Sequence, residues 1–177
     1  RLLALHLGVP HVDTDALVEE EAGVPIARIF ADEGEAGFRE REIRAVEKAL
    51  GMKAVISLGG GAVTIPRVRE LLADASVVRI DVYHDELLRR VKKKSHRPLL
   101  KEDPDGVLRC LRADREPYYR EVETMRIHSD SGPASEVARK IAVRMRAEWR
   151  RVEVGGAKEY GVRIGRGEEE MATDMPD

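Results

Sequence analysis

The sequence predicts an α/β protein in which a parallel sheet is sandwiched between helices. Helical segments alternate along the chain with short apolar runs of strand length, and this alternation is typical of parallel sheets covered on both faces. The length of 177 residues suits one domain of ordinary size. Hydrophobic residues make up 42% of the chain and charged residues 36%, which is typical of a globular protein rather than a disordered one.

The individual elements follow from hydrophobic spacing and from breaks at glycine and proline. Residues 94–105 contain two prolines and many charged side chains, which predicts a mobile loop. Strands are predicted at residues 10–13, 54–58, 77–82 and 125–128. Helices are predicted at residues 1–7, 16–22, 26–32, 40–50, 68–73, 86–93, 107–115 and 135–149.

The sequence changes character after Trp149. Residues 151–154 and 160–165 alternate like strands on either side of a glycine-containing turn, and the last dozen residues are acidic. We therefore expect residues 1–150 to form one domain. Residues 151–177 are expected to be a linker and the beginning of a second, truncated domain.

Composition excludes several classes of function. The formal net charge is −2, so no overall field attracts nucleic acid or an anionic membrane. No run approaches the roughly 18 apolar residues of a membrane-spanning helix. Cys110 is the only cysteine, which rules out an internal disulfide and favours a cytoplasmic location. The five histidines are scattered without the spacing of metal ligands.

Two aspartates follow the first predicted strand. In an extended segment, residues two apart face the same way, so the carboxylates of Asp13 and Asp15 can point into one cleft. One could then help to hold a hydrated magnesium ion while the other receives a hydroxyl proton. The alternative is helix capping, because aspartate is favoured directly before a helix.

Arg39 has an unusual position on the helix predicted around residues 38–50. At 3.6 residues per turn, Ile43, Val46 and Leu50 share one apolar face, and Arg39 lies on that stripe with Glu42 beside it. A guanidinium on an inward face needs an anionic partner, since an unpaired buried charge is costly. Glu42 could be that partner alone, or it could orient Arg39 toward a ligand carboxylate.

Three glycines, Gly59 to Gly61, follow the second predicted strand. Glycine allows the backbone to approach a ligand and to present bare N–H groups. A plain strand-to-helix turn is the alternative. The triplet is not a Walker A loop, because the chain contains no G-x-x-x-x-G-K-[ST] sequence.

Two further arginines lie on either side of the helix predicted at residues 107–115. Arg97 lies in the predicted loop, where a cation suits phosphoryl transfer because charge builds on the phosphate oxygens. Arg115 lies where that helix is expected to end and could share an anion with Arg39. Each could instead be a solvated surface arginine. Tyr118 and Tyr119 are interpreted as packing residues.

Taken together in order, these motifs resemble the shikimate kinase family over roughly residues 1–150. Each motif is common, but their joint order and spacing are specific. The motifs are Val-Asp-Thr-Asp at 12–15, Ile-Phe-Ala-Asp-Glu-Gly-Glu at 29–35, Gly-Phe-Arg-Glu-Arg-Glu at 37–42, Ser-Leu-Gly-Gly-Gly-Ala-Val at 57–63, Arg-Pro-Leu-Leu at 97–100 and Arg-Glu-Pro-Tyr-Tyr-Arg-Glu-Val at 115–122.

The resemblance implies a P-loop kinase of the nucleoside-monophosphate-kinase-like fold, with ATP and Mg²⁺ as cofactors. It implies transfer of the ATP γ-phosphate to the 3-hydroxyl of shikimate, a step of chorismate and aromatic amino acid biosynthesis. It also assigns roles by residue: Asp15 and Arg97 are catalytic and Asp13 orders Mg²⁺. Shikimate is bound by Asp15, Arg39, Gly60 and Arg115, with Arg39 and Arg115 at its carboxylate, and Arg97 contacts ATP.

Two departures from the family pattern lead to further expectations. The family's first strand, which is central in its sheet, and its Walker A loop are expected before residue 1, so this chain alone is predicted not to turn over. The basic residue that the family often carries after its last strand has no counterpart in Ser129-Asp130-Ser131-Gly132. Residues 152–167 resemble the opening of 3-dehydroquinate synthase, which implies a covalent fusion of the two enzymes.

Two alternative functions remain open from the sequence. One is a related kinase that acts on another hydroxylated acid. The other is a degenerate or truncated module that binds a ligand without catalysis.

Overall fold

The computed structural model of the protein describes residues 1–93, 103–129 and 132–153. The predicted loop residues 94–102, including Arg97, and the predicted strand at 160–165 lie outside these ranges. The elements in chain order are α1 (Leu2–Leu7), β1 (His11–Asp13), α2 (Thr14–Ala22), α3 (Ile26–Leu50), β2 (Val55–Ser57), the 3-10 turn η1 (Ala62–Thr64), α4 (Pro66–Leu72), β3 (Val78–Asp81), α5 (His84–Lys93), α6 (Pro104–Val122), β4 (Met125–His128) and α7 (Ala134–Glu153).

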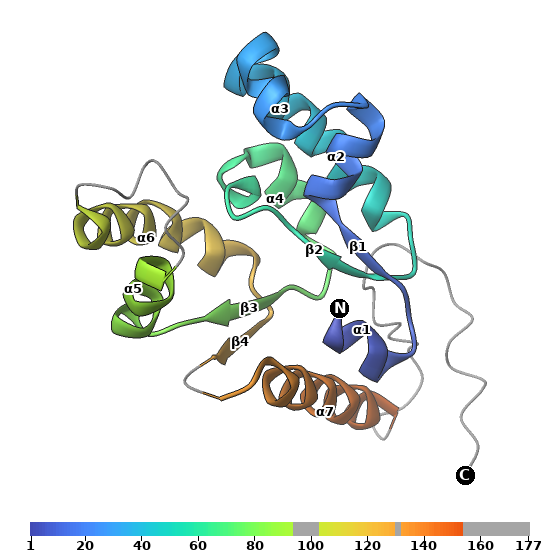
Figure 1. The fold of residues 1–177 in the computed structure, drawn as a ribbon. Coiled ribbons are helices and arrows are strands. Elements are labelled where there is room, and N and C mark those ends of the chain that lie inside the picture. Colours follow the sequence, from blue (N-terminus) through green and yellow to red (C-terminus); the bar gives the residue numbers. More distant parts are fainter. Residues whose placement is uncertain (94–102, 130–131, 154–177) are drawn as a thin grey trace.

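The strands form two parallel pairs. β1 pairs with β2, with Val12 opposite Ile56, and β3 pairs with β4, with Ile80 opposite Ile127. The parallel direction predicted from the alternation of helices and strands is confirmed. The single sheet is not seen, because no described strand joins β1–β2 to β3–β4. Figure 1 shows the two pairs as separate ribbons within one α/β arrangement.

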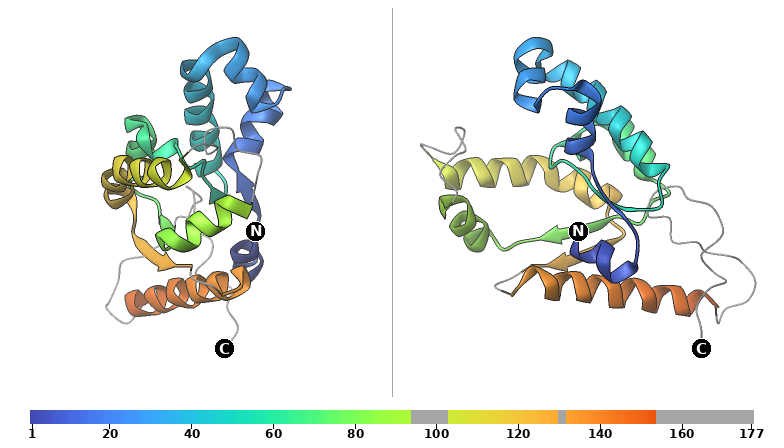
Figure 2. Two further views of the ribbon diagram at one scale, coloured as in Figure 1. Left: turned by 60° about the vertical axis from the view of Figure 1, so that its left-hand side comes forward. Right: turned by 45° about the vertical axis from the view of Figure 1, so that its right-hand side comes forward.

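The β3–β4 pair is covered on one side by α7. Ile141 and Met145 of α7 are buried against Ile127 of β4, and Leu3 and Leu7 of α1 pack at the edge of the same cluster. Val137, Ile141 and Met145, which are four residues apart, therefore form the core face of α7. α6 lies on the other side of the pair, with α5 next to it (Figure 2).

The β1–β2 pair is covered by α2, α3 and α4. α3 is broken at Gly34, which has a left-handed φ of 70° and is not helical. The sequence predicted two helices here, and this break separates them. Across this break, the rings of Phe30 and Phe38 stack with centroids 4.6 Å apart. Val46 and Leu50, predicted to share the apolar face, are both buried in the core between α3, α4 and α6.

α6 is longer than the sequence predicted. The expected end at Arg115 is wrong, because the helix continues to Val122 through Pro117. A proline inside a helix removes one backbone hydrogen bond and disfavours the preceding turn. Here tertiary packing outweighs that cost, since Tyr118 and Tyr119 pack on the core and Val122 is buried in it.

The end of the described chain also differs from the prediction. Residues 151–153, expected to begin a new strand, continue α7 to Glu153. Residues 154–177 lie outside the described part. Among the described helices, none has the length and apolar character that crossing a membrane would need.

Candidate functional site

The carboxyl ends of β1 and β2 are tied together by one threonine. Thr14, at the first position of α2, is fully buried. Its hydroxyl donates to the Ser57 carbonyl at 3.2 Å and accepts from the Gly59 N–H at 3.3 Å. The glycine turn that follows β2 is thus fixed against the start of α2, where ligands of parallel sheets bind.

Asp13 and Asp15 have different roles at this helix start. Asp13 is the N-cap of α2, and its Oδ1 accepts from the Asp15 N–H at 3.1 Å. Asp13 therefore caps the helix, as the alternative from the sequence predicted. Asp15 is only partly exposed, and burial, followed by the charges of Asp13 and Glu19, raises its pKa above the usual 3.8. A carboxylate with a raised pKa accepts a proton more readily than an ordinary aspartate.

Arg39 is held by carboxylates on its own helix. Its Nη1 donates to Glu42 Oε2 at 2.6 Å and its Nη2 donates to Glu35 Oε1 at 3.0 Å. Glu42 is 1% exposed, and burial raises its pKa even though Arg39 opposes the shift. The predicted Arg39–Glu42 pair is present, and it orients the guanidinium toward the glycine turn.

The glycine turn lies very close to these charged groups. A Cβ added at Gly59 would lie 2.8 Å from Glu42 Oε1 and 2.9 Å from Asp15 Oδ1. A Cβ added at Gly61 would lie 2.8 Å from Arg39 Nη1. A Cβ at either position would force these side chains to shift, so the three charged side chains and the glycine backbone share one small space.

Arg115 reaches the same turn from α6. Its Nη1 donates to the Gly60 carbonyl at 3.0 Å, and the Tyr119 hydroxyl donates to the same oxygen at 2.9 Å. Within residues 1–93, 103–129 and 132–153, Arg115 has no carboxylate within ion-pair distance. Its guanidinium therefore has donors to offer to an anionic ligand.

Two backbone donors of the turn are also open. The Gly59 carbonyl accepts from the Ala62 N–H at 3.1 Å, which closes the turn. The N–H groups of Gly60 and Gly61 have no acceptor in the described part of the chain. Backbone donors are normally satisfied, so a ligand oxygen is the natural partner for them.

The predicted site residues are thus largely gathered in one place. Asp15, Arg39 and Arg115 all border the Gly59–Gly61 turn, whereas Asp13 faces the start of α2 and Arg97 lies outside the described residues. Sequence reasoning passed over Thr14 and assigned Tyr119 to packing alone. The spacing of four residues between Arg115 and Tyr119 would have placed both on one helical face, but only if α6 had been extended through Pro117.

The fold is α/β with parallel strands, and guanidinium groups, a carboxylate and open N–H groups lie beyond the strand ends. These are the features of an enzyme that acts on a small molecule. The class is that of the P-loop kinases, as comparison with known proteins shows. The sequence profile of shikimate kinase matches residues 1–146. The chain belongs to the shikimate kinase family, which confirms the resemblance in the sequence.

Individual relatives agree with this assignment. The shikimate kinase of Mycobacterium avium is 44% identical over 150 residues, which cover 83% of this chain and 85% of that protein. The shikimate kinase of Halorhodospira halophila is 42% identical over 144 residues, covering 80% and 81%. The activity of the chain is therefore that of an ATP-dependent kinase that phosphorylates shikimate.

Solved structures show the same fold. The shikimate kinase from Acinetobacter baumannii in complex with shikimate has a TM-score of 0.76 and 37% identity, over 84% of each chain. The shikimate kinase from Aquifex aeolicus has a TM-score of 0.72 and 28% identity, over 88% of this chain and 89% of the other. The predicted fold class is confirmed by these neighbours.

Proposed function

We propose that shikimate binds at the Gly59–Gly61 turn, with its carboxylate on Arg39 and Arg115 and its 3-hydroxyl at Asp15. The observation that carries this proposal is the convergence of these three side chains on one turn. A planar guanidinium matches a carboxylate with two parallel hydrogen bonds. The Gly60 N–H supplies a further donor from the backbone.

In this arrangement Asp15 guides or accepts the proton of the reacting hydroxyl. Its raised pKa, caused first by burial, supports that role. The rest of the catalysis is positioning, because phosphoryl transfer needs little covalent chemistry from the protein. Thr14 contributes by fixing the turn to the start of α2, so that the substrate and Asp15 keep one geometry.

We also propose that Asp13 helps to hold Mg²⁺, which neutralises charge on the transferred phosphate when it is bound. The cap uses Asp13 Oδ1 and leaves Oδ2 for a water of the ion. No group of three or more possible metal-ligating side chains occurs among the described residues. The donors fit a magnesium ion that keeps most of its waters and phosphate oxygens, the usual state of Mg²⁺ in kinases.

Two parts of the phosphate-donor site are proposed from the sequence. Arg97, in the segment between α5 and α6, would contact ATP. A G-x-x-x-x-G-K-[ST] loop is absent from the 177 residues, so we propose that residues outside them cradle the β-phosphate. We expect no turnover from the 177 residues alone, and a steady-state rate comparable to that of an intact enzyme would contradict this.

The same missing segment would supply a strand between β2 and β3. Each of these strands has one partner in the described chain. Ile80, in the middle of β3, is 55% exposed, which is unusual for an apolar residue of a parallel sheet. A further parallel strand, as the family pattern implies, would join the two pairs and cover this side chain.

The experiment that tests the site is calorimetric titration of the full-length protein with shikimate. Arg39→Ala should weaken binding by about 1.5–3 kcal/mol, the contribution of hydrogen bonds to a charged group. Arg28→Ala is the matched control, because Arg28 lies on the same helix but in an exposed pair with Asp32. Unchanged affinity in Arg39→Ala would remove Arg39 from the site. No binding by the unaltered protein would overturn the proposal.

Two wider proposals rest on sequence. We propose that residues 151–177 lead into a 3-dehydroquinate synthase domain, on the resemblance of residues 152–167. Sequencing of the coding region beyond Asp177 tests this, since a stop codon or an unrelated sequence there would exclude the fusion. The single cysteine supports a cytoplasmic location.

A further inference from the structure

Tyr119 makes a contact that its interpretation as a packing residue does not explain. Its ring packs on the core cluster between α3, α4 and α6. Its hydroxyl nevertheless leaves this apolar surface and donates to the Gly60 carbonyl at 2.9 Å. The neighbouring Tyr118 packs on the same cluster, but its hydroxyl makes no hydrogen bond within the described residues. The two adjacent tyrosines therefore differ in one polar contact.

That contact fixes a peptide plane of the glycine turn. The Gly60 carbonyl and the Gly61 N–H belong to one planar peptide and point in opposite directions. Because the carbonyl is held on α6 by Tyr119 and Arg115, the Gly61 N–H is turned away from α6. Glycine has wide rotational freedom, so this peptide would rotate easily without its anchors.

The two anchors of the Gly60 carbonyl are not equivalent. Arg115 has no carboxylate partner in the described chain, and its guanidinium is a proposed ligand of the substrate carboxylate. When the substrate binds, this guanidinium would also donate hydrogen bonds to the substrate carboxylate. Tyr119 has a single hydroxyl and a ring fixed by packing, so its hydrogen bond can persist when Arg115 adjusts to the substrate.

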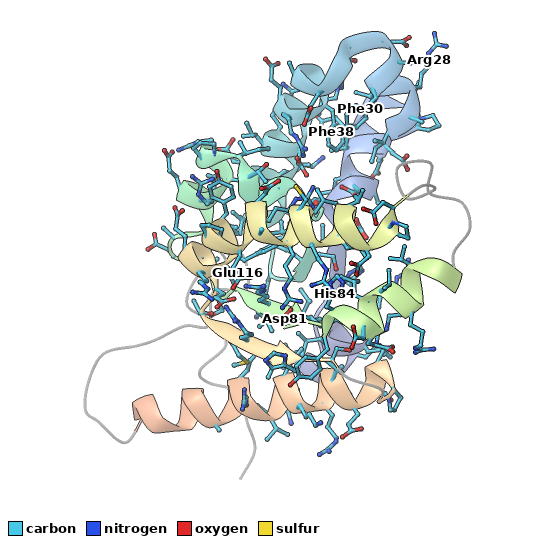
Figure 3. All side chains as sticks on the ribbon, turned by 90° about the vertical axis from the view of Figure 1, so that its left-hand side faces the viewer. Arg28, Phe30, Phe38, Asp81, His84 and Glu116 are labelled. Carbon is cyan, nitrogen blue, oxygen red and sulfur yellow. The ribbon has the colours of Figure 1, made fainter. Side chains whose placement is uncertain are left out.

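The ring of Tyr119 also contacts a residue of the β3–β4 pair. Arg79 of β3 places its Cζ 4.9 Å from the centroid of that ring, a cation–π distance. The Arg79 side chain is 9% exposed and is bonded to Glu116 of α6 at 2.5 Å. Figure 3 shows Glu116 and Asp81 between α6 and the β3–β4 pair. Tyr119 thus connects β3, through α6, to the glycine turn after β2.

We propose that Tyr119 is a positioning residue for shikimate, because its hydroxyl holds the Gly60 carbonyl and so sets the direction of the open Gly61 N–H in the same peptide. The inference rests on the proposed binding of shikimate at this turn. It adds a residue that acts through the backbone and does not itself touch the substrate.

Steady-state kinetics of Tyr119→Phe in the full-length enzyme tests the proposal. We expect KM for shikimate to rise about fivefold, the factor of one ordinary hydrogen bond, with kcat and KM for ATP within about twofold, because the lost interaction acts on substrate binding. Tyr118→Phe is the matched control and should leave all three values unchanged. Equal KM values for the two variants would overturn the proposal, whereas loss of kcat alone would indicate a general structural defect and overturn it too.

A second measurement does not depend on shikimate. The amide NMR signals of Gly60 and Gly61 should shift in Tyr119→Phe and not in Tyr118→Phe, because, of the two tyrosines, Tyr119 alone bonds to the Gly60 carbonyl. Unchanged Gly60 and Gly61 signals would overturn the inference even if shikimate binds normally. Conversely, shifted signals in a protein that binds no shikimate would keep the anchoring role and reject the proposed function.

Discussion

The two strand pairs of the molecule use charged residues in different ways. Beyond β1 and β2, Arg39 and Arg115 border a glycine turn; Arg39 is paired with Glu35 and Glu42, whereas Arg115 has no carboxylate within ion-pair distance among the described residues. Between β3 and α6, Arg79 is surrounded by carboxylates: Glu116 at 2.5 Å, Glu123 at 3.4 Å and Asp81 at 3.9 Å. We refer to Arg79, Asp81, Glu116 and Glu123 as the Arg79 cluster.

The difference separates cations that bind a ligand from cations that hold the fold. In the Arg79 cluster the carboxylates pair with Arg79 and also with Arg112, Arg120 and Arg126, so the protein itself supplies the anions and no external anion is required. At the glycine turn Arg115 meets only a backbone carbonyl within the described chain. A guanidinium without an anionic partner at the carboxyl ends of parallel strands indicates a site for an anion.

The largest expected effect is at Asp15. Asp15→Asn should lower kcat of the full-length enzyme by about 10²–10⁴-fold, the usual contribution of general acid–base catalysis. Asp74→Asn is the control, because Asp74 is an exposed residue after α4. A variant that keeps full kcat would show that Asp15 does not take part in proton transfer.

The same substitution should not cost stability. Burial raises the pKa of Asp15, so its favourable contribution is present below the usual 3.8 and is lost as pH rises through the raised value. At neutral pH the charged form is therefore disfavoured in the fold, and Asp15→Asn should melt about 1–3 °C higher than the unaltered protein. The gain should vanish near pH 4. A lower melting temperature at neutral pH would contradict this assignment of cause.

In the Arg79 cluster the expected effect is on stability instead. Arg79→Ala should lower the free energy of unfolding by about 2–3 kcal/mol, because it removes the most buried cation of the cluster, although Arg112, Arg120 and Arg126 still pair with its carboxylates. This is below the roughly 3–5 kcal/mol of a fully buried pair, since the Glu116 side chain is 24% exposed. Urea unfolding measures the loss. Arg67→Ala, which removes an exposed pair with Glu70, should change stability by less than about 1 kcal/mol.

Much of the site could be predicted from the sequence because its residues lie next to clear element boundaries. Asp15 follows an apolar strand and the glycine triplet follows another, so parallel pairing alone brings them together. Arg39 was identified because a charge interrupted an apolar stripe. Tyr119 could not be identified in this way, because its role depends on α6 continuing through Pro117, which tertiary packing decides.

The limits of the fold prediction have similar causes. Local patterns predicted all four strands, since each is a short apolar run with a polar or glycine end. They did not predict that the strands would form two separate pairs, because a local pattern does not show which strands lie next to each other in space. They also failed at residues 151–153, where a strand-like alternation of valine with charged residues continues the preceding helix.

A smaller effect is expected at Arg115. Arg115→Ala should weaken shikimate binding about tenfold, near the lower end for a hydrogen bond to a charged group, because Arg39 and the turn remain. Its stability should stay within about 0.5 kcal/mol, since no carboxylate loses its partner in the described structure. Calorimetry and urea unfolding on the same sample separate the two quantities. A stability loss as large as that of Arg79→Ala would place Arg115 with the structural cations.

The smallest expected effect is on the stability of a Glu116 variant in the Arg79 cluster, and this effect should depend on pH. Hydrogen bonds from Arg79 and, to a smaller extent, from Arg120 lower the pKa of Glu116 from 4.5 to about 2. The contribution of this carboxylate is therefore present above pH 4.5 and is lost as pH falls toward 2. Glu116→Gln should therefore lower the free energy of unfolding by about 1 kcal/mol at neutral pH, and its difference from the unaltered protein should shrink below pH 4.5. Glu70→Gln, whose carboxylate is 64% exposed, should show neither effect. A constant difference across this pH range would mean that the charge of Glu116 is not what holds α6 to β3.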